Sequence, residues 1–526
     1  MDAQQLLDRV KDPVIAQHCR VDWPGLYVIA SDLQPVSIRD QGLRGYLLIK
    51  RLLASDMLTP GDTHLLIIGA GIAGTTAAVT AACQGVDVTL IDQGTEPFST
   101  LARARTRILD YRQYEWPRTG WRRLKAWHGQ TLPFRFETKN ASDLVSYWRK
   151  IFSHFVDRTK KDKKAGTLTF TGSTTVDPTS IQSIDGGGVS FVARHKATNI
   201  EEDYSSPTVL WCGGFGEERH RLNDDNGIPI YTSYPYWSGD QYEKLSKEKN
   251  AKDKKILISG GGDGALQDYL RVVTGIGTPR EIYEQLQISE QLESSLRAEL
   301  LSLEIDAQRA FCWSGGSNDS DGAILSFLMQ RYEEWSEILL HERTPGSRNL
   351  QVRLAEMLRK SPTVCLAIRR PYLGYCFPLN RLLTTLIAKY LQGVSPRKLP
   401  PLVTRMQITG IDFIEHMTTV ERGNPDACFD NPHVIRFQDT SSKWKEKEHA
   451  SLVKKRPNLI KKLEKIQFDA TIIRHGVDTL EDCGWMTNRV SEITLSQKRH
   501  LLPAITFEKN DFSFWEESVT HINRTG

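Results

Sequence analysis

The chain has 526 residues, more than one ordinary hydrophobic core accommodates, so two or three domains are expected. Hydrophobic residues make up 39% and charged residues 25%, which are the proportions of a soluble globular protein. The formal net charge of +4 does not by itself indicate nucleic acid, and an anionic cofactor suits it equally well.

The eight cysteines are scattered along the chain without any CxxC pair, and we recognise no N-terminal signal sequence. This spacing excludes a zinc ribbon and the paired redox cysteines of a disulfide reductase. Free thiols in a reducing compartment are the simplest interpretation. We therefore expect a cytoplasmic protein with no metal site.

An N-terminal arm, residues 1–60, comes first along the chain. Helical patterns at residues 4–10 and 41–53 flank a strand-like run at residues 26–29. We expect this arm to pack on the main domain.

Residues 64–92 hold the most informative pattern. A buried strand is predicted at residues 65–68, a GxGxxG turn and a small-residue helix follow it, and a second strand ends in an acid. The glycines let the backbone approach a pyrophosphate, the helix N-terminus offers N–H groups to it, and the acid accepts ribose hydroxyls. The expected cofactor-binding residues are Gly69, Ala70, Gly71, Ile72, Ala73, Gly74 and Asp92.

The pattern in residues 64–92 allows two other interpretations. A membrane span over residues 64–85 is disfavoured, because a buried strand, turn and helix places the glycines and threonines where close packing needs them. The other interpretation, a turn of this fold that has lost its ligand, remains a possible alternative.

An arginine- and aromatic-rich stretch follows at residues 102–129. An arginine can pair with a pyrophosphate or stabilise the negative charge of a reduced flavin, so Arg107, together with Arg103 and Arg105, is a candidate cofactor-binding residue. The alternative is that these arginines face solvent.

The strand-turn-helix pattern occurs a second time. Residues 208–216 predict a buried strand that ends in a glycine turn at Gly213 and Gly214. After a lysine-rich linker, residues 255–275 contain Gly260, Gly262 and Ala265 in the GxGxxA form. No second strand ending in an acid or arginine is evident, because helical residues 281–307 follow, and Asp263 would repel a pyrophosphate.

Helical spacing continues over residues 281–359 and predicts a helical insertion that forms a lid or a partner surface. The last strand pattern, residues 470–475, ends in a turn at Gly476. His475 is a weak catalytic candidate, as a proton donor beside a flavin, although such a histidine is more often structural.

This order of parts resembles the two-dinucleotide-binding-domain flavoproteins, the superfamily of glutathione-reductase-like enzymes and flavin monooxygenases. The resemblance implies an α/β fold with a Rossmann-like FAD-binding domain, a second nucleotide-binding-like domain and a helical insertion. Residues 212–216 resemble the strand end before the second domain, and residues 472–476 resemble a strand that returns to the FAD domain. The expected divisions are residues 1–60, 61–220, 221–400 and 401–526.

We therefore expect an FAD-dependent oxidoreductase that passes hydride, supplied by NAD(P)H, through flavin to an organic substrate or oxygen. The alternative is a nucleotide-sensing or partner-binding protein that keeps the fold without turnover, with the helical insertion contacting a protein partner. A flavoprotein acting on RNA ranks last, because the basic runs are best interpreted as solvated surface. We expect no membrane association.

Overall fold

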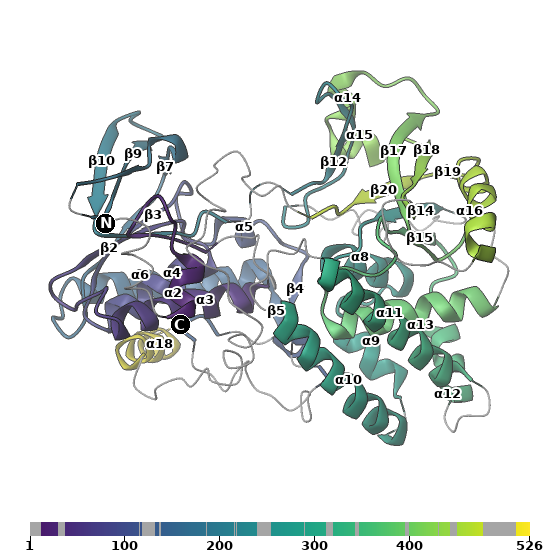
Figure 1. The fold of residues 1–526 in the computed structure, drawn as a ribbon, viewed down its shortest axis with the longest axis horizontal. Helices are drawn as coiled ribbons and strands as arrows, with labels where there is room; N and C mark the ends of the chain where they lie inside the picture. Colours follow the sequence, from purple (N-terminus) through teal and green to yellow (C-terminus); the bar gives the residue numbers. More distant parts are fainter. Residues whose placement is uncertain are drawn as a thin grey trace.

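The computed structural model has two α/β lobes that lie next to each other along the long axis of the molecule (Figure 1). The first lobe contains the early strands and the C-terminal helix, and the second contains most of the chain after residue 220. The residues that the structure describes are 12–29, 37–114, 116–117, 132–135, 138–185, 187–214, 216, 218–238, 254–288, 290–311, 319–341, 347–394, 399–429, 431–441, 450–476 and 512–525.

A five-stranded parallel sheet forms the centre of the first lobe, in the order β1-β11-β2-β3-β6. In β2 every residue except His64 is buried, which is typical of a parallel strand with both faces covered. The strands are β1 (Leu26–Val28), β2 (His64–Ile68), β3 (Asp87–Ile91), β6 (Leu168–Thr171) and β11 (Thr208–Trp211).

Small residues allow two helices of this lobe to pack closely. In α4 (Ile72–Cys83) nearly every position is alanine, threonine or glycine, and α3 (Ile38–Ala54) lies against it. A Cβ atom added to Gly45 of α3 would lie 2.5 Å from the carbonyl oxygen of Ala73. α3 and β1 correspond to the helix and strand expected in the N-terminal arm, whereas residues 4–10 lie outside the described part of the chain.

An antiparallel sheet lies between β6 and β11 along the chain. It consists of β7, β9 and β10, with β8 paired to β9, and it lies on one side of the first lobe (Figure 1). The remaining elements here are α2 (Pro13–His18), α5 (Ser99–Ala102), β4 (Ile108–Leu109), η1 (Tyr111–Tyr114), β5 (Lys139–Asn140), α6 (Ala141–Thr159), β7 (Thr174–Val176), η4 (Pro178–Ser180), β8 (Gln182–Ser183), β9 (Val189–His195) and β10 (Glu201–Ser206).

The second lobe repeats this plan. Its parallel sheet has the order β16-β15-β14-β20, and an antiparallel sheet of β17, β18 and β19 precedes the last parallel strand. The elements are β12 (Arg221–Asn223), β13 (Pro229–Thr232), β14 (Lys255–Ser259), α8 (Asp263–Thr274), β15 (Thr363–Ala367), α13 (Pro378–Val394), β16 (Leu402–Val403), β17 (Met406–Phe413), α14 (Thr419–Arg422), α15 (Pro425–Phe429), β18 (His433–Asp439), α16 (Ala450–Leu463), β19 (Gln467–Phe468) and β20 (Ala470–Ile473).

The helical insertion that the sequence predicted lies between α8 and β15. Its buried leucines and aromatic residues share one core with α8, α13 and the parallel strands. Its helices are α9 (Pro279–Leu286), α10 (Glu290–Phe311), α11 (Asp319–Leu340) and α12 (Ser347–Met357).

One expectation about the domains is wrong. We expected residues 472–476 to return to the first domain, but β20 pairs in parallel with β14, with Ile472 beside Ile258, and so completes the second sheet. The division at residue 400 therefore cuts the second lobe. The segment that does return is α18 (Ser513–Thr525), where the carbonyl of Phe514 accepts a 3.0 Å hydrogen bond from Arg158 of α6.

None of the helices in the described part of the chain is long and apolar enough to cross a membrane. Within the same residues, no group of three or more histidine, cysteine or acidic side chains could hold a metal ion.

Candidate cofactor sites

The first glycine turn is packed tightly on its inner side and open on its outer side. Gly69 has a φ of +101°, and a Cβ atom there would lie 2.1 Å from the carbonyl oxygen of Cys212. A Cβ atom on Gly74 would lie 1.9 Å from the carbonyl oxygen of Gly69. By contrast, a Cβ atom on Gly71 would meet nothing within 4 Å. The open space in front of Gly71 is where a pyrophosphate needs to approach the backbone.

The helix that follows this turn begins without a capping side chain. Gly71 is the N-cap of α4, and no side chain hydrogen-bonds to the first turn within the described structure. The first N–H groups of a helix have no partner inside the helix and favour an anion. Residues Ile72 and Ala73 therefore offer donors to a diphosphate, which fits the expected role of the turn.

Asp92 follows β3 at the same edge of the sheet. Its carboxylate accepts hydrogen bonds from the N–H groups of Ala70 and Gly94, each at 2.6 Å. Burial raises the pKa of Asp92, and these two N–H groups oppose that effect. Each carboxylate oxygen can accept a second hydrogen bond, so Asp92 both fixes the turn and keeps acceptor capacity for ribose hydroxyls.

The turn at Gly213 and Gly214 reaches the same edge. It follows β11, whose register places Trp211 beside Ile68 of β2. The N–H of Cys212 donates to the carbonyl of Ile68 at 2.6 Å. The structure thus places Gly213 and Gly214 next to the first glycine turn, and their expected role in cofactor binding stays a prediction.

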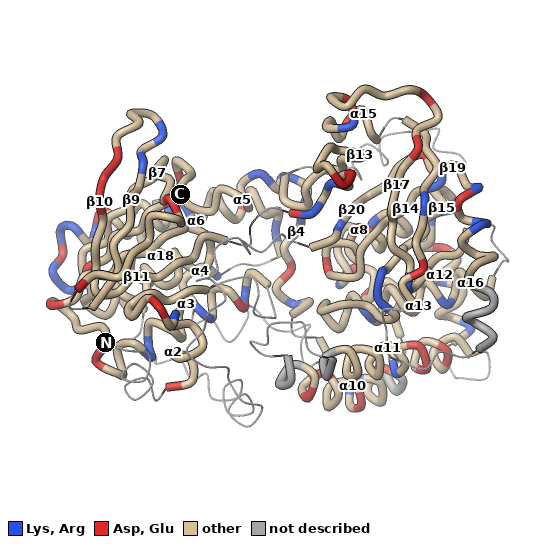
Figure 2. Tube along the Cα trace, turned by 45° about the horizontal axis from the view of Figure 1, so that its top comes forward, with Lys and Arg blue, Asp and Glu red and all other residues tan. Residues whose placement is uncertain are grey.

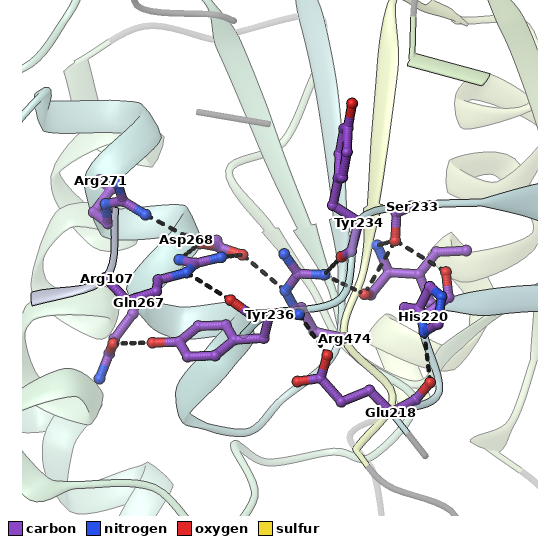
Figure 3. A network of polar contacts seen from close by, with 11 residues as sticks. Arg107, Glu218, His220, Ser233, Tyr234, Tyr236, Gln267, Asp268, Arg271 and Arg474 are labelled. Atoms are coloured by element: carbon purple, nitrogen blue, oxygen red, sulfur yellow. Dashed lines mark hydrogen bonds and ion pairs between the residues drawn. The ribbon is translucent and has the colours of Figure 1, made fainter. Parts of the chain in front are cut away.

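Arg107 binds residues of the second lobe, and its expected role at the cofactor stays a prediction. Its guanidinium is buried and forms an ion pair with Asp268 of α8 in the second lobe (Figure 3). Its Nε donates to the carbonyl of Tyr236 at 2.9 Å, and the group lies 3.8 Å from the centroid of the Tyr236 ring. The arginine is therefore committed to the protein itself.

Asp268 is the centre of this polar network. Nε of Arg474 donates to it at 2.9 Å, and Arg271 lies 3.8 Å away (Figure 3). Burial alone would raise the pKa of Asp268, but the positive charges of Arg107 and Arg474 outweigh burial and bring the pKa to about 2. Asp268 therefore stays ionised at neutral pH.

The second glycine turn has the same geometry as the first. Gly260 has a φ of +143°, and a Cβ atom there would lie 2.1 Å from the carbonyl oxygen of Arg474. Gly262 is the N-cap of α8 and lacks a side-chain cap, and its nearest atom to an added Cβ is the carbonyl oxygen of Tyr375 at 3.9 Å. Ala265 stands where the first turn has Gly74.

Asp263 does not face the open side of this turn. Its carboxylate accepts hydrogen bonds from the N–H of Phe377 at 2.8 Å and from the side-chain amide of Asn380 at 2.6 Å. The repulsion that we expected between Asp263 and a pyrophosphate is thus reduced, because the side chain is turned towards the loop after β15. Gly374 of that loop donates to the carbonyl of Gly261 at 2.7 Å.

The sequence analysis did not predict two arginines near the second glycine turn. β15 is the parallel neighbour of β14, and Arg369 and Arg370 lie two and three residues beyond its last residue, Ala367, close to the position that Asp92 has directly after β3 in the first lobe. Arg369 is exposed. Our expectation that no strand ends in such a residue is therefore wrong, because the helical insertion separates the two strands by about a hundred residues along the chain. A repeat search that allowed a long insertion would have found them.

His475 and Gly476 lie at the edge of the second sheet, next to Ser259 and away from the first glycine turn. Nε2 of His475 is 2.7 Å from the hydroxyl oxygen of Ser259. Desolvation and the charges of Arg219 and Arg369 lower the pKa of His475, although its side chain keeps contact with solvent, which screens part of this effect. The role of His475 as a proton donor beside a flavin stays a prediction.

A cavity of about 790 Å³ adjoins the first site. It begins one residue beyond Asp92 and extends to Tyr236 and Ser238, and four of its 14 lining residues are arginines. In the tube of Figure 2, Lys and Arg positions (blue) occur around α5 and β4, where the chain passes between the two lobes. This volume is typical of a pocket for a small molecule. The lining residues are Gln93, Gly94, Thr95, Glu96, Ser99, Ala102, Arg103, Ala104, Arg105, Thr106, Arg107, Arg149, Tyr236 and Ser238.

The chain has two strand-turn-helix units, each with the glycine pattern of a dinucleotide-binding turn. Residues 64–109 match the family model described as FAD binding domain. This match covers the first glycine turn, Asp92 and the arginines that follow, and it confirms the resemblance to FAD-binding flavoproteins. FAD is therefore the cofactor of the first unit.

Comparison with curated proteins finds no match. Among solved structures, bacillithiol disulfide reductase from Staphylococcus aureus is similar with a TM-score of 0.37 and 8% identity over 87% of this chain and 98% of that one. Thioredoxin reductase from Lactococcus lactis has a TM-score of 0.35 and 11% identity over 88% of this chain and 100% of that one. A cadaverine monooxygenase from Erwinia amylovora has a TM-score of 0.32 and 12% identity over 85% of this chain and 82% of that one. At these TM-scores we base no argument on the three structures.

Proposed function

We propose that the protein is an FAD-dependent oxidoreductase that uses NADPH as its electron donor. The observation that carries the proposal is the pair of matching glycine turns, each closed on its inner side by a strand-end carbonyl and open in front of its second glycine, Gly71 or Gly262. FAD held at the first turn would supply hydride acceptance and two-electron transfer, with NADPH as the donor and an organic substrate or oxygen as the acceptor.

The residues of the first lobe supply binding and orientation. The N–H groups at the start of α4 hold the diphosphate, and Asp92 holds the ribose while it fixes the turn through Ala70 and Gly94. The adjoining cavity has room for the rest of the cofactor or for a substrate.

The second lobe favours NADPH over NADH. An arginine near the end of the second strand accommodates a 2′-phosphate, whereas an acid at that place selects NADH. Arg369 and Arg370 follow β15 and place positive charge there. Arg219, whose charge also acts on His475 at this edge, adds further positive charge.

The electron acceptor differs from that of a dithiol-dependent reductase. The sequence has no CxxC pair, and the six cysteines in the described residues are free thiols. Burial raises the pKa of Cys212, the cysteine nearest the first glycine turn, so this thiol is not poised to become a thiolate. We therefore place the acceptor among small organic molecules or oxygen.

The proposal is tested with the visible spectrum of the purified protein under anaerobic conditions. Flavin absorption bands that are bleached by stoichiometric NADPH, and more slowly by NADH, are the expected result. A yellow protein that neither coenzyme reduces would contradict the assignment of the donor.

A second candidate is a nucleotide sensor without turnover. It is favoured by the loop after β15, in which Gly374 and Phe377 hydrogen-bond to Gly261 and Asp263 and so lie over the second turn. A protein that binds nucleotide but carries no flavin would support this candidate instead.

A further inference from the structure

One segment of the chain packs into both lobes. It consists of residues 106–114, 116 and 117, and we name it the bridging segment. Its Leu109, Tyr111 and Tyr114 are part of the hydrophobic core of the first lobe, whereas Trp116 is part of the core of the second. The ring of Trp116 meets that of Tyr283 edge-on, with centroids 6.1 Å apart. The lobes are thus joined through a buried segment.

Two ion pairs attach the bridging segment to the helices of the second lobe. Arg107 pairs with Asp268 of α8, and each side chain is only 3% exposed. Asp110, whose side chain is 1% exposed, accepts a 2.5 Å hydrogen bond from Nε of Arg280 in α9. Separating a buried pair leaves uncompensated charge in the interior, so both contacts resist a rotation of one lobe against the other.

Arg107 acts directly on the helix that carries the second glycine turn. α8 begins at that turn, and Asp268 lies in its second turn. Tyr236, over whose ring the guanidinium lies, donates its hydroxyl hydrogen bond to Gln267 of the same helix at 2.5 Å. Arg107 and Tyr236 also line the cavity that begins next to Asp92. The contact therefore connects the helix that follows the second glycine turn with the cavity beside Asp92, and Figure 3 shows its residues.

We propose that Arg107 is a positioning residue that, with Asp268, holds the two dinucleotide-binding lobes in one relative orientation and so sets the approach between the two cofactors. The consequence for catalysis rests on the proposed function, because orientation affects transfer only if both turns are used. The consequence for shape does not depend on it.

The test uses the full-length protein and an Arg107→Met variant, which keeps side-chain length and removes the charge. Arg474 and Arg271 remain beside Asp268 in this variant, so its carboxylate stays compensated and the protein is expected to fold. Arg348→Met is the control, since Arg348 lies on α12, is exposed and does not line the cavity. Arg107→Lys tests rescue by a conservative change.

Two measurements are made on each protein. Small-angle scattering is expected to show a larger maximum dimension for Arg107→Met than for the wild type, Arg348→Met and Arg107→Lys. Anaerobic stopped-flow reduction by saturating NADPH is expected to slow at least tenfold in Arg107→Met, with FAD content unchanged and partial recovery in Arg107→Lys.

The outcomes separate this proposal from the proposed function. Identical scattering curves for the wild type and Arg107→Met would overturn the proposal that Arg107 and Asp268 hold the two lobes in one orientation, whatever the activity. Altered scattering with an unchanged reduction rate would overturn the positioning role. A wild type that NADPH does not reduce would contradict the proposed donor, and the positioning role with it, while scattering still decides whether Arg107 and Asp268 fix the lobes.

Discussion

The carbonyl oxygen of Cys212 lies 2.1 Å from the point that a Cβ atom would occupy on Gly69. The carbonyl oxygen of Arg474 stands in the same relation to Gly260, also at 2.1 Å. In each lobe, the residue after the last strand of the parallel sheet thus closes the inner side of the glycine turn. Both turns require glycine for the same steric reason, and both leave their outer side for a ligand.

Gly71→Val should remove FAD without unfolding the protein. The new side chain meets no protein atom within 4 Å of its Cβ and enters the space that the diphosphate needs. We expect flavin content to fall at least tenfold and the melting temperature of the apoprotein to stay within a few degrees of the wild-type apoprotein. Absorbance and thermal denaturation measure both. Gly393→Val, also in open space, is the control, and full flavin content in Gly71→Val would refute the assignment.

Gly69→Val should instead destabilise the first lobe. A β-branched residue at a φ of +101° is strained, and its Cβ would collide with Cys212. We expect a loss of about 3 kcal/mol or more in the free energy of unfolding, measured by urea denaturation of the apoprotein. A loss below about 1 kcal/mol would show that the backbone adapts.

Gly262→Val should spare FAD and prevent its reduction by NADPH. The only atom within 4 Å of the new Cβ is the Tyr375 carbonyl oxygen, so the side chain fills the path of the coenzyme rather than the core. Stopped-flow bleaching of the flavin is the measurement. If the reduction rate survives, the second turn is structural and the donor binds elsewhere.

Arg369→Gln should change the choice of coenzyme. Loss of a charged hydrogen bond to a phosphate raises the KM for NADPH by roughly ten- to a hundredfold and leaves that for NADH nearly unchanged. Arg436→Gln, on β18 and paired with Asp412, is the control in the same lobe. Equal effects on both coenzymes would argue against a 2′-phosphate contact.

Asp263 gives the stability a defined pH dependence. Burial raises its pKa to about 7, against the hydrogen bonds from Phe377 and Asn380. The folded state therefore binds the proton more tightly than the unfolded state, so the free energy of unfolding falls as pH rises from about 4 to 7. Asp263→Asn keeps the acceptor oxygen and removes the charge. We expect it to raise that free energy by about 1–3 kcal/mol at pH 8 and to leave it unchanged at pH 4. An equal effect at both pH values would contradict this explanation.

Local patterns in the sequence predicted the parts of the fold that are continuous along the chain. The run from His64 to Asp92 specifies strand, turn and helix within one segment, and β2, α4 and β3 follow it. The repeat at Gly260 and the helical insertion were predicted for the same reason.

What the sequence did not predict depends on contacts between distant segments. Arg107 has the chemistry of a phosphate ligand, but whether it meets a cofactor or Asp268, 161 residues away, is decided by tertiary packing. β20 carries the same short apolar pattern as a strand of either sheet, and only its pairing with β14 assigns it to the second lobe. Arg369 was not predicted, because the helical insertion separates it along the chain from the second glycine turn.

A crystal structure of the protein grown with FAD tests the central claim most directly. The account predicts electron density for the diphosphate within hydrogen-bonding distance of the N–H groups of Ile72 and Ala73, with the adenosine ribose at Asp92. Density for the cofactor at another place, or no density before Gly71 at saturating FAD, would contradict it.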